Sequence, residues 1–451
     1  MQKIFDIYSQ LGTLPNNLIF SIAAVFLCVG AVILFVLNSK RADKAEVEAR
    51  EFSAYLPALD GLRAVSTILI FSFHMWQQSW ISYRLQLTDK IWLFNLEPLQ
   101  RYGYVVLDAF YVLSGFCLFY PVAREMFGEC KRQDLKTFYI KRARKILPSY
   151  VLILLLILIF PVAGQIVNQD MPVHELLKHY LMHLLFIHNF SSDTVMSVVP
   201  TAWTMSIEVQ FYVMFPLICI FFRRKPVLTT LGMIAVGVAV RMYLMVFSKM
   251  DQFAQANTFG YFDIFAFGML AAYLVVKMRH STVNWEKLRW LMTVLAVLSL
   301  VAAYHFMNFM GGAKLSDGSG ADVYARFCYR FIPGIMFALF ILSACYSKKF
   351  FEKGICGNMF FVFMSGISYN FYLVQQNVNI LLKRMGIPYA STNPVMNDRN
   401  AMEGFTLIAT AICIIYAVLV TNYIEKPICK YGYKGCFSRL VPKSLKKSVV
   451  K

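Results

Sequence analysis

Two ionisable side chains stand inside the apolar stretch ALDGLRAVSTILIFSFHMW, residues 58–76. Arg63 lies near its start and His74 deep inside it. Eleven helical residues make three turns plus about 20°, so both side chains lie on one face, about 16.5 Å apart along the axis. Arginine binds phosphate through its planar fork of donors, and histidine exchanges protons near neutral pH. The spacing is comparable to an extended pantetheine arm; the alternative is a packed histidine with an arginine that reaches to the membrane edge.

Four more ionisable side chains interrupt apolar segments, namely Asp108, Glu208, Arg241 and Asp263. Each costs at least ~2.5–3.5 kcal/mol to place in lipid, so such groups usually face the interior of a helix bundle and usually have a function. Together with the first pair, they form the candidate set for a site inside the membrane.

The composition predicts an all-α, polytopic membrane protein. Of its 451 residues, 58% are hydrophobic and only 15% are charged. A helix needs about 20 apolar residues to cross a hydrocarbon core of ~30 Å. Such windows predict a bundle of about 11 transmembrane helices, at residues 17–38, 59–80, 102–122, 146–166, 200–222, 226–247, 260–278, 289–309, 325–346, 357–382 and 403–424.

The positive charges are distributed unevenly. The formal net charge is +19, and most of the 44 Lys and Arg residues lie in alternate connections and in the tail 425–451. Since cytoplasmic loops collect Lys and Arg, we expect an outside N-terminus and a cytoplasmic C-terminus in the cell (plasma or inner) membrane. Membrane lipid is therefore an expected partner, and nucleic acid is not. The first window could be a signal peptide, but no small-residue cleavage site follows it, so we expect an uncleaved helix.

Cysteine and histidine spacing predicts neither a disulfide framework nor a metal site. The ten cysteines are scattered singly, which does not fit a set of disulfide pairs. The segment HELLKHYLMHLLFIHNF, residues 174–190, is too mixed to span the membrane and is expected to be interfacial or re-entrant. His174 and His179 are about 140° out of phase on a helix, so HELLKH is not a zinc-binding HExxH motif.

Several motifs, in order along the chain, resemble the integral-membrane acyltransferase family 3. LDGLR with a histidine after ten further residues opens the series. The others are VVLDAFYVLSGFCLF (105–119), KRARKILPSY (141–150), AWTMSIEVQFYVMFP (202–216), YFDIFAFGMLAAY (261–273), ISYNFYL (367–373) and IEKP (424–427). The resemblance implies an extra N-terminal helix and linker at 1–54, a ten-helix acyltransferase domain at 55–428 and a basic tail at 429–451.

The resemblance implies transfer of an acyl group, usually acetyl, from acetyl-CoA on the cytoplasmic side to a hydroxyl of a carbohydrate on the outer side. His74 is then the general base towards the acceptor hydroxyl, or the group that handles the acyl carbonyl. Arg63 binds CoA phosphate or orients the thioester. Glu208 orients His74, binds sugar hydroxyls or forms a structural ion pair with Arg241. No metal is expected.

Other residues of the motifs have supporting roles in this interpretation. A basic group at the cytoplasmic end binds CoA phosphate, anchors its helix in the membrane, or does both. Asp108 could pair with Arg63, with a structural or a functional role. Ser114, with Gly115, is expected to allow close helix contact and not to act as a nucleophile. The basic group is Arg142, Arg144 and Lys145, and the remaining supporting residues are Trp203, Tyr212, Arg241, Tyr369 and Tyr372.

Two positions depart from the family pattern. Gln375 stands where the family often has histidine, which puts proton transfer there in doubt. Lys145 replaces a common arginine, which keeps the charge but loses bidentate phosphate geometry. A transporter and a non-catalytic relative that binds acyl-CoA or glycan are the rival functions. The sequence lacks two related halves with broken helices, and it retains Arg63 and His74, so the enzyme is favoured.

Overall fold

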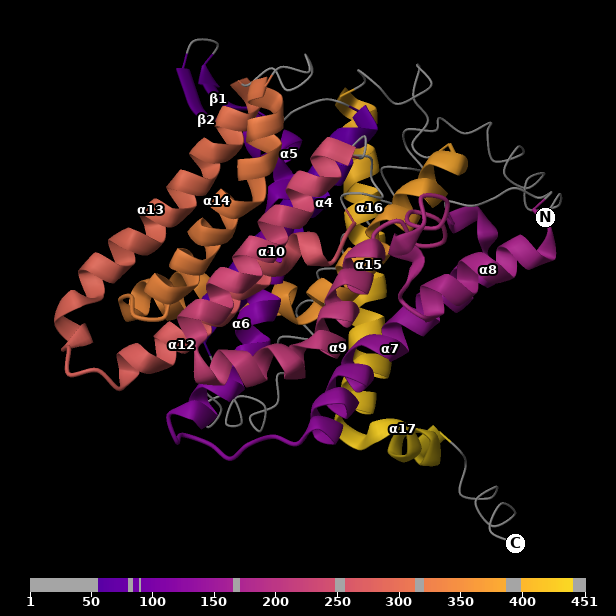
Figure 1. The fold of residues 1–451 in the computed structure, drawn as a ribbon. Helices are drawn as coiled ribbons and strands as arrows, with labels where there is room; N and C mark the ends of the chain where they lie inside the picture. Colours follow the sequence, from indigo (N-terminus) through magenta and orange to yellow (C-terminus); the bar gives the residue numbers. More distant parts are fainter. Residues whose placement is uncertain are drawn as a thin grey trace, which may run out of the picture.

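The structure is a computed structural model, and it describes residues 56–79, 84–88, 91–164, 171–247, 256–312, 320–386 and 399–440. The first predicted span, 17–38, lies outside the described residues. Long helices packed side by side form the described part, with one short β-hairpin at one end (Figure 1). This confirms the prediction of a polytopic helical bundle.

The elements follow one another with short connections. The antiparallel hairpin β1–β2 lies in the predicted loop 81–101 and pairs Arg84 with Asn95. The bounds are α4 Pro57–Ser79, β1 Arg84–Thr88, β2 Ile91–Asn95, α5 Glu97–Arg101, η1 Gly103–Val106, α6 Leu107–Met126, α7 Leu135–Ile159, η2 Pro161–Ala163, α8 Val173–Leu184, η3 His188–Phe190, α9 Trp203–Arg224, α10 Pro226–Phe247, η4 Phe259–Tyr261, α12 Phe262–Arg279, α13 Trp285–Gly312, α14 Gly320–Ala344, η5 Phe350–Cys356, α15 Met359–Arg384, α16 Arg399–Val420, η6 Thr421–Glu425 and α17 Lys426–Leu440.

Apolar helices occupy the predicted spans that lie in the described residues. The windows that begin at residues 146, 325 and 357 correspond to α7, α14 and α15. Among the described residues, the helical stretches that are long and apolar enough to cross a membrane are Pro57–Gln78, Gly103–Met126, Trp203–Arg224, Pro226–Leu244, Phe259–Arg279, Trp285–Phe309 and Ala401–Tyr433. The chain is therefore a multi-pass membrane protein.

Helix α7 begins well before the apolar window that predicts it. The window starts at residue 146, whereas α7 starts at Leu135. Asp134 accepts a hydrogen bond from the backbone N–H of Thr137 at 2.7 Å and so caps the helix. The run of Lys and Arg that follows is composed of good helix formers. Arg142 and Lys145 are therefore held on a helix and not in a loop.

Helices α6 and α12 make the closest contact in the core. A Cβ at Gly115 would lie 2.3 Å from the carbonyl oxygen of Phe265, and one at Gly268 would lie 2.0 Å from that of Val112. Only glycine permits backbones to approach this closely. The expected close contact at Gly115 is confirmed, and it fixes the neighbouring turn of α6 that carries Ser114.

The two ends of the bundle differ. The α6–α7 connection, the α12–α13 connection and α17 lie at one end, and the hairpin β1–β2 lies at the other (Figure 1). The first three carry many of the Lys and Arg residues that the sequence places in alternate connections. We call their end the basic end.

Candidate active site

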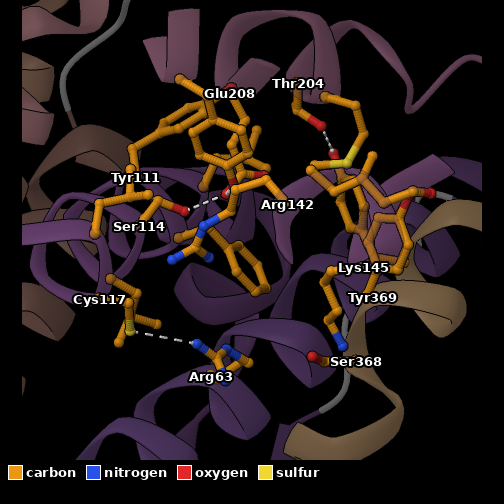
Figure 2. A pocket seen from close by; sticks show the side chains of 18 of the residues that line it. Arg63, Tyr111, Ser114, Cys117, Arg142, Lys145, Thr204, Glu208, Ser368 and Tyr369 are labelled. Atoms are coloured by element: carbon orange, nitrogen blue, oxygen red, sulfur yellow. Dashed lines mark hydrogen bonds between the residues drawn. The ribbon is translucent and has the colours of Figure 1, made fainter. Parts of the chain in front are cut away.

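Five helices enclose a cavity of about 190 Å³, here called the central cavity (Figure 2). The walls come from α4, α6, α7, α9 and α15, so segments from residue 63 to residue 372 meet in one place. Its polar and ionisable lining residues are Arg63, Tyr111, Ser114, Cys117, Arg142, Lys145, Thr204, Glu208, Tyr212, Ser365, Ser368, Tyr369 and Tyr372. Most of the residues predicted from the motifs are among them.

Glu208 is the carboxylate of this cavity. Ser114 donates a hydrogen bond to Glu208 Oε1 at 2.5 Å, and Tyr212 donates one to the same oxygen, also at 2.5 Å. Charge-assisted hydrogen bonds of this kind are short and fix the carboxylate in position. Ser114 therefore holds Glu208, a role that the sequence analysis did not predict.

Two arginines face the cavity without a carboxylate partner. Arg63 Nη2 contacts Cys117 Sγ at 3.8 Å, which is a weak interaction (Figure 2). The Arg142 guanidinium lies over the rings of Phe138 and Tyr212, 5.7 Å from each centroid. In the described part of the chain, no salt bridge within 4.0 Å joins either arginine to an acid. Most of their donors are thus available to an anionic ligand.

Two further basic residues of the 141–145 run, Lys145 and Arg144, are held differently. Lys145 lines the cavity and forms an ion pair with Glu425, whose other oxygen accepts a hydrogen bond from Asn370 at 2.9 Å. Arg144 lies outside the cavity lining, because its guanidinium packs against Gly432 of α17. Of these three residues, Arg142 is therefore the freest cation that lines the cavity.

The aromatic residues of the motifs shape the cavity walls. Tyr369 donates a hydrogen bond to the carbonyl of Ile146 at 3.0 Å, which ties α15 to α7. Thr204 donates one to the Tyr372 hydroxyl at 3.1 Å, which ties α9 to α15. Trp203 is not in the lining; its ring lies 6.4 Å from that of Tyr261. These bonds keep three walls of the cavity in register.

His74 lies just beyond the central cavity. Its Nδ1 is 3.0 Å from Gln77 Oε1 and contacts the side-chain amide of Gln376. The Gln77 carbonyl oxygen accepts from a protonated Nδ1, whereas the Gln376 amide nitrogen donates to an unprotonated Nδ1, so each contact fits a different tautomer. The tautomer that bonds Gln77 leaves the Nε2 lone pair free for a general base. Gln376 is four residues, about 6 Å, from Tyr372 along α15. Facing stripes of α4 and α15 thus connect His74 to the cavity.

Three expected pairings are replaced by others. Glu208 bonds Ser114 and Tyr212, and neither a hydrogen bond nor an ion pair joins it to His74 or Arg241 in the described residues. Asp108 pairs with Arg330 at 3.1 Å and not with Arg63.

Arg241 forms a bidentate pair with Asp263, at 2.8 and 2.6 Å, instead of a pair with Glu208. The physical reason for these exchanges is helix order. α6 packs against α12 and α14, and α10 packs against α12, so their charges meet one another away from the central cavity. Asp108 and Arg241 therefore have structural partners.

Sequence reasoning missed several residues of the site. Gln376 contacts His74, and Glu425 holds Lys145. Glu425 lies in the IEKP motif, which could have identified it, but its partner is 280 residues away. Gln376 has no signal beyond its position one helical turn after Tyr372. Gln375, the position that departs from the family pattern, is fully buried, and neither its oxygen nor its nitrogen has a hydrogen-bond partner among the described residues.

The described residues contain no group of three or more His, Cys, Asp or Glu side chains that could hold a metal ion.

The segment after α7 forms the 12-residue helix α8, about 18 Å long and too short to cross a membrane. His183 and His188 stack there with ring centroids 3.7 Å apart. Ser197 and Ser206 hydrogen-bond these two rings.

Comparison with known proteins gives a consistent result. The profile of acyltransferase family 3, described as an acyltransferase domain, matches residues 56–423. The peptidoglycan O-acetyltransferase OatA of Listeria monocytogenes is 23% identical over 411 residues, which are 85% of this chain and 57% of that protein. The putative peptidoglycan O-acetyltransferase YrhL of Bacillus subtilis is 24% identical over 420 residues, 86% of this chain and 57% of its own length. No solved structure matches.

Proposed function

Because this chain belongs to acyltransferase family 3, we propose that it moves an acyl group, most simply acetyl, from acyl-CoA to a hydroxyl of a cell-surface or membrane-associated carbohydrate. Residues 55–428 form the acyltransferase unit in this proposal. The chain spans 57% of the length of the two relatives compared above, so their complete activities are not transferred to it.

The central cavity is the observation that carries this proposal. It brings Arg63 and Arg142, which pair with no acid among the described residues, into one space with a fixed carboxylate, Glu208. A phosphate or a polarised thioester carbonyl is the kind of group that two such guanidiniums bind. His74 contacts Gln376, which lies one helical turn beyond the lining residue Tyr372, and we place there the acceptor hydroxyl that is deprotonated.

In the proposed reaction the acyl group moves directly from donor to acceptor. The acceptor oxygen attacks the thioester carbonyl carbon while His74 Nε2 takes the hydroxyl proton. The C–O ester bond forms, the C–S bond breaks, and the proton passes from His74 to the departing thiolate, which leaves as CoA thiol. Arg63 lies about 16.5 Å from His74 along α4, so it binds the pantetheine arm of the donor and not the carbonyl that reacts at His74. Glu208, held by Ser114 and Tyr212, binds acceptor hydroxyls.

We also propose how the bundle is oriented in the membrane. The basic end of the bundle faces the cytoplasm, where acyl-CoA is available, and the hairpin end faces outward, in the cell (plasma or inner) membrane. The distribution of Lys and Arg supports this arrangement. The N-terminus then lies outside and the tail 429–451 inside.

A carbohydrate acceptor is supported by the names of two relatives, each called a peptidoglycan O-acetyltransferase or a putative one. Glycan hydroxyls suit a cavity that combines tyrosine hydroxyls with a carboxylate, because such groups form hydrogen bonds with sugars. The acceptor class is therefore part of the proposal.

Release of CoA thiol from acetyl-CoA by the purified protein in detergent tests the function. The reaction is followed with and without soluble peptidoglycan fragments or a surface-glycan extract. We expect the glycan to stimulate release and His74→Ala to abolish it, with acetyl-CoA binding retained. His74→Gln, which keeps a polar side chain, controls for folding. Equal thiol release by the parent and both variants would contradict the assignment of His74, and no release by the parent would contradict the proposed function.

A further inference from the structure

A second cavity, of about 430 Å³, lies next to the first; we call it the basal cavity. Its walls come from α6, α7 and α9 and from the α6–α7 connection, which lies at the basic end of the bundle (Figure 1). Leu118 and Arg142 line both cavities. The two spaces therefore adjoin at these side chains.

The two cavities follow one another along the same helices. On α6 the central cavity uses residues from Leu107 to Leu118, and the basal cavity continues from Leu118 to Glu125. On α9 the central cavity ends at Tyr212 and the basal cavity runs on to Arg223. At 1.5 Å per residue, the α6 wall is about 27 Å long. This continuous wall suits one long ligand with different ends.

The basal cavity has several basic side chains in its lining, and only Arg223 among them pairs with an acid of the described residues. Four basic residues line it: Lys131, Arg132, Arg142 and Arg223. Its two acids have partners already, since Glu125 pairs with Arg223 at 2.8 Å and Asp134 caps α7. The Nε atoms of Arg142 and Arg223 are buried and have no hydrogen-bond partner within the described ranges. Lys131 and Arg132 are exposed at the opening.

Apolar and aromatic side chains line the rest of this space. Phe138 and Phe215 stack with their ring centroids 5.4 Å apart, and Val122 and Ile220 also line the cavity. Arg142 lies over Phe138 on the basal side and over Tyr212 on the central side. A planar heterocycle with attached phosphates combines the two kinds of group that such a lining recognises.

We infer that the basal cavity binds the phosphorylated nucleotide end of the acyl-CoA donor, with Lys131 and Arg132 on its phosphates. The pantetheine arm passes Arg142 into the central cavity, which at about 190 Å³ is the smaller of the two spaces. This inference rests on the proposed function, because it names the donor subsite for the same reaction.

Donors with and without the nucleotide test the inference. The KM is measured for acetyl-CoA and for acetyl-pantetheine, which lacks the nucleotide and all phosphates. In Lys131→Ala with Arg132→Ala we expect the KM for acetyl-CoA to rise about tenfold, because charge-assisted contacts to phosphate are lost. The KM for acetyl-pantetheine should stay unchanged. Lys136→Ala with Lys141→Ala is the matched control, since both lysines are exposed on α7 and line neither cavity.

The outcomes separate this inference from the proposed function. An unchanged ratio of the two KM values in the variant, with the parent active, would overturn the inference and leave the transferase standing. The inference would also be overturned if the only change in the variant were the loss of activation by added anionic phospholipid. Lys131 and Arg132 would then bind a lipid headgroup and not the donor. A parent that releases thiol from neither donor would overturn the proposed function itself.

Discussion

Two groups of charges lie inside the bundle, and they differ in how they are paired. Between α6, α10, α12 and α14, Asp108 faces Arg330 and Asp263 faces Arg241, each at 3.1 Å or less. In the central cavity, Arg63 and Arg142 face open space, with no acid within 4.0 Å in the part of the chain that the structure describes. The charges of the first group form ion pairs with one another. The two arginines of the second group are available to an anionic ligand.

An ionisable residue in a membrane helix can thus be structural or functional. Such a residue is costly in lipid, so it must have either a partner or a function. Sequence alone marks Arg63 and Arg241 equally. Only the packing shows that Arg241 has a carboxylate in bidentate geometry and that Arg63 has a thiol at 3.8 Å.

Breaking a structural pair should have the largest effect on stability. Asp263→Asn leaves the buried Arg241 without its counter-charge, and we expect the free energy of unfolding to fall by ~3–5 kcal/mol. The thermal midpoint in detergent measures this. Asp263→Leu combined with Arg241→Met should recover much of the loss, because both charges are then removed. A single variant as stable as the parent would contradict the structural role.

Removing the negative charge of Glu208 in the central cavity should lower the rate of acyl transfer without affecting folding. Glu208→Gln keeps the size of the side chain and both hydrogen bonds can still form, so we expect a thermal midpoint close to that of the parent. Loss of the negative charge should lower kcat/KM for the glycan about 10- to 100-fold, the effect of a lost charged hydrogen bond of ~1.5–3 kcal/mol. Unchanged kinetics with the glycan would show that Glu208 does not contact the acceptor.

Two neighbouring glutamines of α15 differ in their contacts, and their variants should differ in rate. Gln376→Leu removes a contact to His74 Nδ1, and we expect kcat to fall about tenfold with an unchanged KM for acetyl-CoA. Gln375→Leu removes a fully buried amide that has no hydrogen-bond partner in the described residues, so kcat should stay within about twofold and stability should not fall. Equal losses of kcat in both variants would contradict the assignment of Gln376 to His74.

The smallest effect concerns pH and the stacked histidines outside the spans. Burial lowers the pKa of His188 to about 4 from its ordinary value of 6.5. The unfolded chain therefore binds the proton more readily, and stability is lost as pH falls from about 6.5 towards 4. Between pH 7 and pH 6 we expect a loss of ~0.7 kcal/mol from this group. His188→Asn should flatten the pH dependence of the thermal midpoint, and an unchanged slope would contradict the buried neutral state.

The sequence predicted the fold class and most of the polar lining of the central cavity, but few of the contacts. Apolar windows located the described helices, and the motifs identified a membrane acyltransferase, which the family match confirms. The apolar windows did not locate the first residues of α7, because a helix rich in Lys and Arg has the low hydropathy that is typical of a loop. Pairings such as Asp108 with Arg330, 222 residues apart, depend on which helices are neighbours, and periodicity within one helix does not contain that information.

A direct comparison of Arg63→Gln with Arg241→Gln tests the central claim, by the rate of CoA thiol release per folded molecule. We predict that Arg63→Gln remains monodisperse with a thermal midpoint near that of the parent and loses most of its rate. Arg241→Gln should lower the yield of folded protein, and the molecules that remain folded should release CoA thiol at a rate close to that of the parent. A stable, inactive Arg241→Gln beside a fully active Arg63→Gln would contradict the account.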